Sequence, residues 1–334
     1  MSKILAIESS CDETAAAIIE NGKTILSNVV ASQIDVHEKF GGVIPEIASR
    51  IHIENITMVI QECMEKANQR FEDVDAIAVT QGPGLVGSLH VGVQAAKTLA
   101  WAFNKPLIPV HHIAGHIYAN NLVADMKFPL LALVVSGGHT ELVYMSDEWS
   151  FEVVGTTQDD AIGEAFDKVG RVLNLPYPGG VYIDKLAKSG KNIHKLPHPK
   201  AEKELDFSFS GLKSGVLQFI KRCERNNETF TPEDLACSFQ ETAIACLLER
   251  AEKALAIYQP KQIVLAGGVA ANSCLRVRIK EMVDNKFPEI ECIIPPLFCC
   301  TDNAAMIGVA GTVAYLHNVR GDSSCTANPG LDIE

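Results

Sequence analysis

The order of apolar and polar stretches along the chain predicts alternating strands and helices. Residues 3–10 form an apolar run, KILAIESS, that leads into the polar turn SCDET, and a second apolar run, AAAII, follows at 15–19. Residues 129–145 repeat this order, with the polar turn SGGHTE between two apolar runs. Short apolar runs bounded by turn residues are typical of buried strands, so each stretch predicts two strands joined by a turn.

A second unit also occurs twice. Residues 75–103 and 261–283 each combine an apolar run, a glycine-rich turn and a longer helical stretch. Each half of the chain therefore has a strand pair first and a strand–glycine–helix unit later, a repeat of pattern and not of letters. This order predicts a duplicated α/β fold with a cleft between the two halves.

Three longer stretches predict helices between these units. Residues 45–68 begin with Pro45, which is tolerated in the first turn of a helix. Residues 231–258 begin with Thr231 as a predicted N-cap, followed by Pro232 at the first helical position and Asp234 near the capping-box position. The third helix spans residues 301–317.

The length of 334 residues indicates two domains. We place the first half at residues 1–125, joined by a C-terminal helix at about 305–334, and the second at 126–304. No apolar run approaches the roughly 18 residues that span a bilayer, and the N-terminus does not resemble a signal peptide. The ten cysteines form no C-x-x-C pair, so we expect reduced, largely buried thiols and a cytoplasmic protein without membrane contact.

The net charge of −12 argues against a broad basic face for nucleic acid. The charge is unevenly spread, because residues 185–225 hold ten Lys or Arg against four Asp or Glu, a local charge of +6. This basic segment is either a solvated helix face with a polar loop or a contact for a phosphate backbone.

Two histidines, His112 and His116, carry the clearest metal-binding pattern. Four residues apart on a helix, they point the same way and can hold one metal ion. Asp302 is the best candidate for a third ligand, with a plain helix N-cap as its alternative role. Two histidines and one carboxylate leave coordination positions open, which suits Fe(II) or Zn(II) acting on a bound ligand.

The same histidines do not form a peptidase motif. Zinc peptidases place a glutamate directly after the first histidine or directly before the second, where it acts as general base. Here these positions are Ile113 and Gly115. A metallopeptidase is therefore disfavoured.

Other candidates lie in the turns. The turns VSGGHT and AGGVAAN follow predicted strands, and their backbone N–H groups can approach phosphate or ribose. Neither matches a P-loop. Asp12 and Glu13, in the first turn, can position a nucleophile or a cation, although turns favour Asp in any case. Asp167 and Asp184 lie on helical stretches beside glycines, where carboxylates either accept hydrogen bonds from ligand hydroxyls or are simply solvated.

Eight motifs in order along the whole chain resemble those of the TsaD/Kae1/Qri7 family, and of its bacterial branch in particular. They are IESSCDETAAAI, QGPGLVGSLHVG, PVHHIAGH, VSGGHTEL, GEAFDKVGRVLNLPYPGG, DFSFSGLKS, AGGVAANSCLR and CTDNAAMIG. The resemblance implies the duplicated actin/hexokinase/Hsp70-like fold. It also implies an acyltransferase that moves the threonylcarbamoyl group of threonylcarbamoyl-AMP to N6 of adenosine 37 in tRNAs reading codons that begin with A. TsaB and TsaE are the implied partners.

The resemblance also implies roles for individual residues. One divalent metal, Fe(II) in first place and Zn(II) as the alternative, is held by His112, His116 and Asp302. Archaeal members add a tyrosine ligand, whose place here is taken by Val134. Asp12 and Glu13 match the family's acidic pair and are the candidate catalytic residues. The positions implied to bind the donor are Val134, Val135, Ser136, Gly137, Gly138, Asp167, Gly180, Asp184 and Asn272.

Two alternative hypotheses for the function of the whole chain stay open at this point. A small-molecule kinase or carbamoyltransferase of the same fold is one, although phosphoryl transfer needs Mg²⁺, which the histidine pair suits poorly. A non-enzymatic scaffold is the other, and the joint presence of metal ligands and glycine turns disfavours it.

Overall fold

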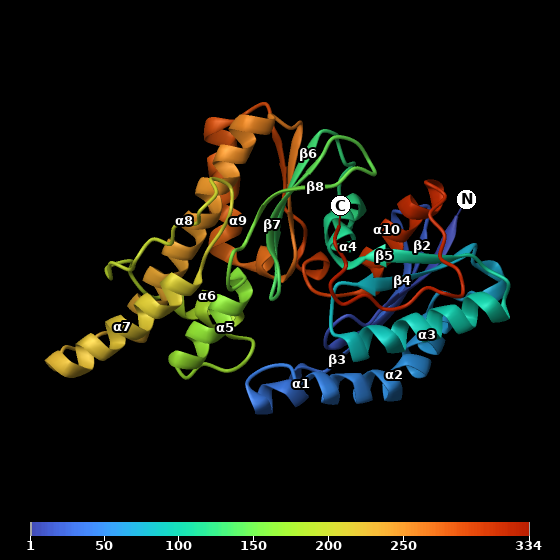
Figure 1. The fold of residues 1–334 in the computed structure, drawn as a ribbon, viewed down its shortest axis with the longest axis horizontal. Helices are drawn as coiled ribbons and strands as arrows, with labels where there is room; N and C mark the ends of the chain where they lie inside the picture. The colour runs from blue at the N-terminus through green and yellow to red at the C-terminus, as the bar shows by residue number, and fades with distance from the viewer. Residues whose placement is uncertain (1, 334) are drawn as a thin grey trace. The chain divides into compact units, whose positions relative to one another are not determined.

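The computed structural model describes residues 2–333 and divides into two compact units, each built around a five-stranded sheet (Figure 1). The first unit comprises Met1–Met126, Glu148–Ser150 and Leu297–Glu334, and the second comprises Lys127–Asp147 and Phe151–Pro296. Residues 297–304, which the sequence pattern assigns to the second half, lie in the first unit. Asp302 therefore belongs to the same unit as His112 and His116.

The sheet of the first unit has the order β3-β2-β1-β4-β5. Its strands are β1 (Lys3–Glu8), β2 (Glu13–Glu20), β3 (Thr24–Ser32), β4 (Ala76–Gly82) and β5 (Leu107–His111). The first three strands pair antiparallel, β4 pairs parallel with β1, and β5 pairs parallel with β4.

The sheet of the second unit repeats this topology strand for strand, in the order β10-β9-β6-β7-β8. Its strands are β6 (Leu130–Val135), β7 (Thr140–Met145), β8 (Glu152–Thr156), β9 (Gln262–Ala266) and β10 (Glu291–Ile293). The first three are antiparallel, and β9 and β10 continue the sheet in parallel from β6. The predicted duplication is confirmed, and the strand pairs and glycine units fall where the sequence pattern predicted them.

Helices cover both faces of the first sheet. They are α1 (Ile34–His37), α2 (Pro45–Lys66), α3 (Val86–Ala102), α4 (His112–Tyr118) and α10 (Ala304–Leu316). Alternate residues of β1 face opposite ways, as strand geometry requires. Leu5 and Ile7 join the apolar cluster under α2 and α3, whereas Ala6 lies against α10, close to Gly308.

Helices of the second unit are α5 (Ile162–Val172), α6 (Gly179–Ala187), α7 (Ser210–Asn226), α8 (Pro232–Tyr258) and α9 (Ser273–Lys286). The predicted start of α8 is confirmed, because the Thr231 hydroxyl accepts a hydrogen bond from the Asp234 backbone N–H at 3.2 Å. The predicted start of α2 at Pro45 is also confirmed. Short 3₁₀ turns complete the chain at Glu38–Phe40, Phe71–Asp73, Ala119–Leu122, Gly268–Ala271 and Leu297–Cys299.

All ten cysteines are free thiols, as expected from their irregular spacing. Cys299 and Cys300 are buried. Burial raises the pKa of the Cys299 thiol to about 12, so this thiol stays protonated at neutral pH.

Within residues 2–333, no helix combines the length and the apolar character that a membrane span needs.

Candidate metal centre and nucleotide-binding turns

The helix α4 presents the two predicted histidine ligands. It begins directly after β5, and the His111 ring caps it by accepting a hydrogen bond from the Ile113 backbone N–H at 3.1 Å. His112 and His116 lie one turn apart, with ring centroids separated by 4.7 Å and ring planes nearly perpendicular. Both rings are buried, so few water molecules compete with a bound ion.

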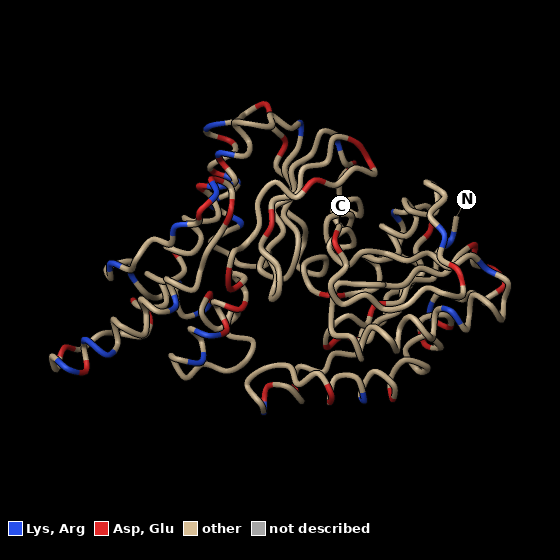
Figure 2. The backbone as a smooth tube through the Cα atoms, viewed as in Figure 1, with Lys and Arg blue, Asp and Glu red and all other residues tan. Residues whose placement is uncertain are grey.

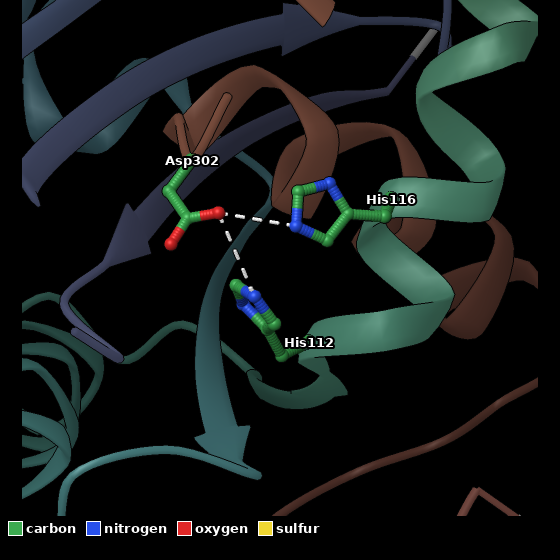
Figure 3. A group of neighbouring side chains, drawn as sticks. All are labelled: His112, His116 and Asp302. Atoms are coloured by element: carbon green, nitrogen blue, oxygen red, sulfur yellow. Dashed lines mark ion pairs between the residues drawn. The ribbon is translucent and has the colours of Figure 1, made fainter. Parts of the chain in front are cut away.

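Asp302 reaches these rings from the start of α10 (Figure 3). A Cβ atom on Gly115 would lie 2.7 Å from the Ile307 side chain, so α4 and α10 pack closely there. Asp302 was also a candidate N-cap for α10, but Asn303 has that role, and its side chain accepts a hydrogen bond from the Met306 N–H at 3.2 Å. The expected helix start at Thr301 or Asp302 is thus shifted to Asn303.

The three side chains fit a metal ion. The ligand atoms of His112, His116 and Asp302 all lie within 4.8 Å of one another. Oδ1 of Asp302 is 3.7 Å from Nε2 of His112 and 3.1 Å from Nε2 of His116 (Figure 3). Among residues 2–333, the close polar neighbour of the buried Nε2 of His116 is Asp302, so a cation between the two would be bound by both. A set of two imidazoles and one carboxylate is a ligand set that Fe(II) and Zn(II) accept.

A carboxylate that the sequence analysis did not single out lies behind His112. Glu8 ends β1, is fully buried, and places Oε2 3.3 Å from Nδ1 of His112. The Ser10 hydroxyl lies 3.1 Å from the same nitrogen. The sequence held one signal of this site, a glutamate at the end of an otherwise apolar strand, but nothing in it pointed to His112.

Charges of opposite sign stabilise one another at this site. Burial alone would lower the pKa of His112, but the carboxylates of Asp302 and Glu8 raise it to about 9. Burial alone would raise the pKa of Glu8, but the charge of His112 and hydrogen bonds from His112 and Ser10 hold it below the usual value. The surroundings of the site thus favour a positive charge, whether it is a proton on His112 or a cation.

The predicted acidic pair, Asp12 and Glu13, lies close to the carboxylate of Asp302. Asp12 is buried in the turn before β2, and Glu13 is the first residue of β2. Burial and the negative charges of Asp302 and Asp12 raise the pKa of Glu13 to about 10. A cation beside Asp302 would offset part of this charge and lower the pKa of Glu13.

The glycine turns of the second unit lie side by side. In the β6–β7 turn, Gly137 and Gly138 are exposed, and an added Cβ would meet no atom within 4 Å. The turn after β9 packs against this one, since a Cβ on Gly267 would lie 2.5 Å from the Val135 carbonyl oxygen and 3.2 Å from Ser136 Cβ. Gly267 has φ +90°, a conformation that side chains rarely adopt. Open backbone of this kind suits close approach of phosphate or ribose.

Asp167 and Gly180 lie where α5 meets α6. The Asp167 carboxylate accepts a hydrogen bond from the Gly179 backbone N–H at 2.7 Å. Burial raises the pKa of Asp167 to about 6, against hydrogen bonds from Gly179 and Gly180 that lower it. The Asp167 side chain therefore already fixes the start of α6.

The remaining predicted donor-binding residues have structural partners as well. Asn272 caps α9 by accepting from the Leu275 N–H at 3.0 Å, and its amide donates to Gln240. Asp184 accepts from the Ser273 hydroxyl at 2.8 Å. Val134 and Val135 are fully buried in β6, between β7 and β9, so they line the base of the turn and are not themselves exposed to a ligand.

Comparisons with known proteins cover the whole chain. The family profile described as "TsaD: tRNA N6-adenosine threonylcarbamoyltransferase" matches residues 24–309. A relative from Bacillus cereus with the name tRNA N6-adenosine threonylcarbamoyltransferase is 58% identical over 332 residues, 99% of this chain and 96% of the relative. A relative of the same name from Anoxybacillus flavithermus is 57% identical over 98% of this chain and 96% of its own length.

Solved structures of much lower identity show the fold. The structure of HypF from T. kodakarensis superposes with a TM-score of 0.67 at 14% identity, over 95% of this chain and 48% of that chain. The activator of 2-hydroxyisocaproyl-CoA dehydratase from Clostridium difficile, solved with ADPNP, gives a TM-score of 0.55 at 12% identity, over 96% of this chain and all of that chain. These likenesses confirm the duplicated actin/hexokinase/Hsp70-like fold. The profile match and the full-length identities together place the chain in the TsaD family, the tRNA N6-adenosine threonylcarbamoyltransferases.

Proposed function

We propose that this acyltransferase moves the threonylcarbamoyl group of threonylcarbamoyl-AMP to N6 of adenosine 37 in tRNAs reading codons that begin with A. The observation that carries the proposal is 58% identity over 99% of the chain to a relative with the corresponding name. In the reaction, a bond forms between N6 and the carbamoyl carbon, and the bond from that carbon to the phosphate oxygen breaks. AMP leaves, and N6 loses one proton. The tRNA substrate agrees with the cytoplasmic location that we expect.

We assign one divalent cation to His112, His116 and Asp302, with Fe(II) in first place and Zn(II) as the alternative. Such an ion supplies Lewis-acid stabilisation of charge on carbamoyl or phosphate oxygens. The support from the structure is the close approach of the three ligand atoms and the burial of the two histidine rings.

We assign the donor nucleotide to the glycine turns of the second unit. The exposed backbone of Gly137 and Gly138 can donate N–H groups to phosphate oxygens. Asp167 lies on α5, Asp184 on α6 bonds to Ser273 at the start of α9, and Gly180 and Asn272 lie at the starts of α6 and α9. N–H groups in the first turns of both helices already bond to the side chains of Asp167 and Asn272, so the exposed backbone of Gly137 and Gly138 is the main support for phosphate binding.

Adenosine N6 is a weak nucleophile, because its lone pair is delocalised into the ring. A reactive mixed anhydride and accurate positioning can supply much of the rate. Asp12 and Glu13 are the candidates for positioning the acceptor amine. Burial and the charges of Asp302 and Asp12 raise the pKa of Glu13, which favours its protonated form as long as no cation is bound at Asp302. This argues against Glu13 as a general base while Asp302 carries an uncompensated charge.

We assign part of the tRNA surface to the basic segment, residues 185–225. The segment runs from the end of α6 through a long loop into α7, where Figure 2 shows its Lys and Arg residues in blue. Lys195, Lys200 and Lys203 are exposed on the loop. Exposed cations on one loop suit contacts to phosphates.

We propose TsaB and TsaE as partner subunits, as the family resemblance implies. The first unit carries a feature that supports a protein partner, an apolar groove of about 1250 Å³ between α2 and α3. Ile53, which is 64% exposed, and Val91 line it. Large exposed apolar patches on soluble proteins commonly mark sites where another protein binds. Ile53→Asp should weaken association with the partner that covers the groove, measured by size-exclusion chromatography against Val277→Asp, a change at an exposed valine of α9.

The test of the proposed function is reconstitution. The purified protein, with TsaB and TsaE, is incubated with threonylcarbamoyl-AMP and tRNA, and modified adenosine is measured by mass spectrometry of the digested tRNA. We expect threonylcarbamoyl-adenosine in a tRNA with A at position 37 and none when that base is G. Phosphorylation of a small molecule, without modified tRNA, would instead support the kinase alternative and contradict the proposal.

A further inference from the structure

Glu8 is buried next to the candidate metal centre, and the proposed function gives it no role. It is fully buried at the end of β1. Its Oε1 accepts a hydrogen bond from the Ser10 backbone N–H, and its Oε2 accepts one from the Thr80 hydroxyl, both at 2.5 Å. A buried carboxylate is costly unless hydrogen bonds or a positive charge compensate it. The third group that faces Glu8 is the ring of His112.

The contact with His112 fixes which ring nitrogen is available to a cation. Nδ1 of His112 lies 3.3 Å from Glu8 Oε2 and 3.1 Å from Ser10 Oγ. Because a carboxylate can only accept, Nδ1 must carry the proton that points at Glu8. Nε2 is then the nitrogen that faces Asp302, at 3.7 Å. A carboxylate behind a ligating imidazole is the arrangement that orients metal-bound histidines in proteins.

His116 has no such support. Its Nδ1 is buried and has no hydrogen-bond partner within residues 2–333. The two histidines of one helix therefore differ: both have Nε2 toward Asp302, but among the described residues only His112 has a carboxylate at its Nδ1. This difference makes the role of Glu8 specific to one ligand, and it provides an internal control.

We propose that Glu8 is a positioning residue of the metal centre, which accepts the Nδ1–H of His112, holds that ring with Nε2 toward Asp302, and makes Nε2 a stronger ligand. The inference rests on the proposed metal role of His112, His116 and Asp302. It adds a residue of β1 to a site whose ligands come from α4 and the start of α10.

The first measurement is metal affinity. The dissociation constants of Zn(II) and Co(II) are measured on the full chain by competition with a chromophoric chelator. Loss of an outer-shell partner weakens metal affinity by about 10–100-fold. We expect about 10-fold for Glu8→Gln, which keeps the shape and an acceptor oxygen, and up to about 100-fold for Glu8→Ala. Thr80→Val removes another partner of Glu8 but leaves His112 beside the carboxylate, and should change the constant by less than about 3-fold.

The second measurement separates positioning from a general loss of structure. In the Zn(II)-loaded protein with labelled histidines, the Nδ1–H proton of His112 should appear far downfield and be protected from exchange. Glu8→Gln should shift this signal upfield and leave the ring signals of His116 in place. The thermal midpoint of each metal-free variant shows whether it is folded, and the isosteric Glu8→Gln keeps the test valid where Glu8→Ala does not fold.

Two outcomes overturn the inference in different ways. An unchanged dissociation constant in folded Glu8→Gln, with tight binding by the wild type, would remove the role of Glu8 and leave the metal centre intact. Failure of the wild type to bind either ion would overturn the metal centre itself, and the role of Glu8 with it.

Discussion

Nε2 of His116 lies 3.1 Å from Oδ1 of Asp302, although the first unit gathers these residues from distant parts of the chain. The close packing of α4 against α10 at Gly115 makes the approach possible. Asn303 caps α10, so the carboxylate of Asp302 is not used as the helix cap. The His116–Asp302 pair is therefore the contact on which the metal assignment depends.

Loss of a residue that only orients a metal ligand weakens metal affinity by about 10–100-fold. Asp302→Asn should weaken metal affinity by more than this, because it removes the charge of a ligand itself. His112→Ala and His116→Ala should act in the same direction, and each should lower tRNA modification. Bound metal is measured by elemental analysis after dialysis. Full occupancy in the double histidine variant would show that the ion is held elsewhere.

Asn303→Ala is the matched control for Asp302→Asn. It removes the N-cap of α10 and should lower the free energy of unfolding by about 1 kcal/mol, measured by urea denaturation. Metal affinity should stay close to that of the wild type. A loss of metal equal to that of Asp302→Asn would indicate that the order of the helix start, and not the carboxylate, controls the site.

Asn272 tests the nucleotide assignment, provided that its capping role is separated from binding. Asn272→Ala should weaken adenine nucleotide affinity and also lower the free energy of unfolding by about 1 kcal/mol through loss of the cap. Asn272→Asp retains a cap oxygen for the Leu275 N–H but loses the amide that donates to Gln240 and adds a negative charge, so it should keep the cap and still bind nucleotide more weakly. Calorimetry gives both affinities, and wild-type affinity in the Asp variant would remove Asn272 from the site.

Asp167 predicts a pH dependence of stability. Its pKa is raised from 3.8 to about 6, so between these values the folded state binds more protons than the unfolded state. The free energy of unfolding due to this group therefore falls as pH rises from about 4 to 6, and the loss persists at higher pH. Asp167→Asn should remove this component. Urea denaturation at pH 4.5 and 6.5 measures it, and equal pH slopes in the two proteins would contradict the raised pKa.

Asp167→Ala carries a separate prediction for binding. The variant should lower adenine nucleotide affinity without loss of metal, because Asp167 lies in the second unit and the metal ligands lie in the first. Calorimetry and elemental analysis on the same sample check this. Loss of both ligands together would indicate misfolding of the chain.

The basic segment predicts salt-dependent tRNA binding. Charge removal at Lys195, Lys200 and Lys203 together should weaken tRNA affinity and flatten its dependence on salt, by roughly 0.7–0.9 in the logarithmic slope for each phosphate that is no longer neutralised. Donor affinity should not change. Because the chain has a net charge of −12, binding should be weak alone and tighter with TsaB and TsaE.

A matched control comes from lysines of the same unit. Lys253, Lys280 and Lys286 each form an ion pair with a neighbouring acidic residue. Their joint replacement by Gln removes the same formal charge and should leave the slope of the salt dependence near that of the wild type. Equal slopes for the wild type and the basic-segment variant would show that the segment is only a solvated face.

Local patterns were sufficient for the architecture and for half of the metal site. The repeated order of apolar runs and glycine turns predicted both sheets, because strand and helix periods are properties of neighbouring residues. The spacing of His112 and His116 predicted a shared direction for the same reason. The four outer strands, β3, β5, β8 and β10, were not predicted, since a strand at the edge of a sheet depends on its pairing more than on its own apolar pattern.

Contacts through space required the folded chain. The sequence offered Asp302 as a ligand, but only the packing of α10 on α4 brings it to the histidines. Glu8 carried no sequence signal for its contact with His112, because the sequence does not distinguish a buried glutamate from an exposed one. The packing of the sheet and α4 around Glu8 decides this. The capping role of Asn272 is local and could be predicted from its place before a helix, whereas its bond to Gln240 depends on the packing of α9 against α8. The periodicity of apolar residues is a local property that the sequence determines. The partner of a buried polar group depends instead on which distant helix or strand packs over it.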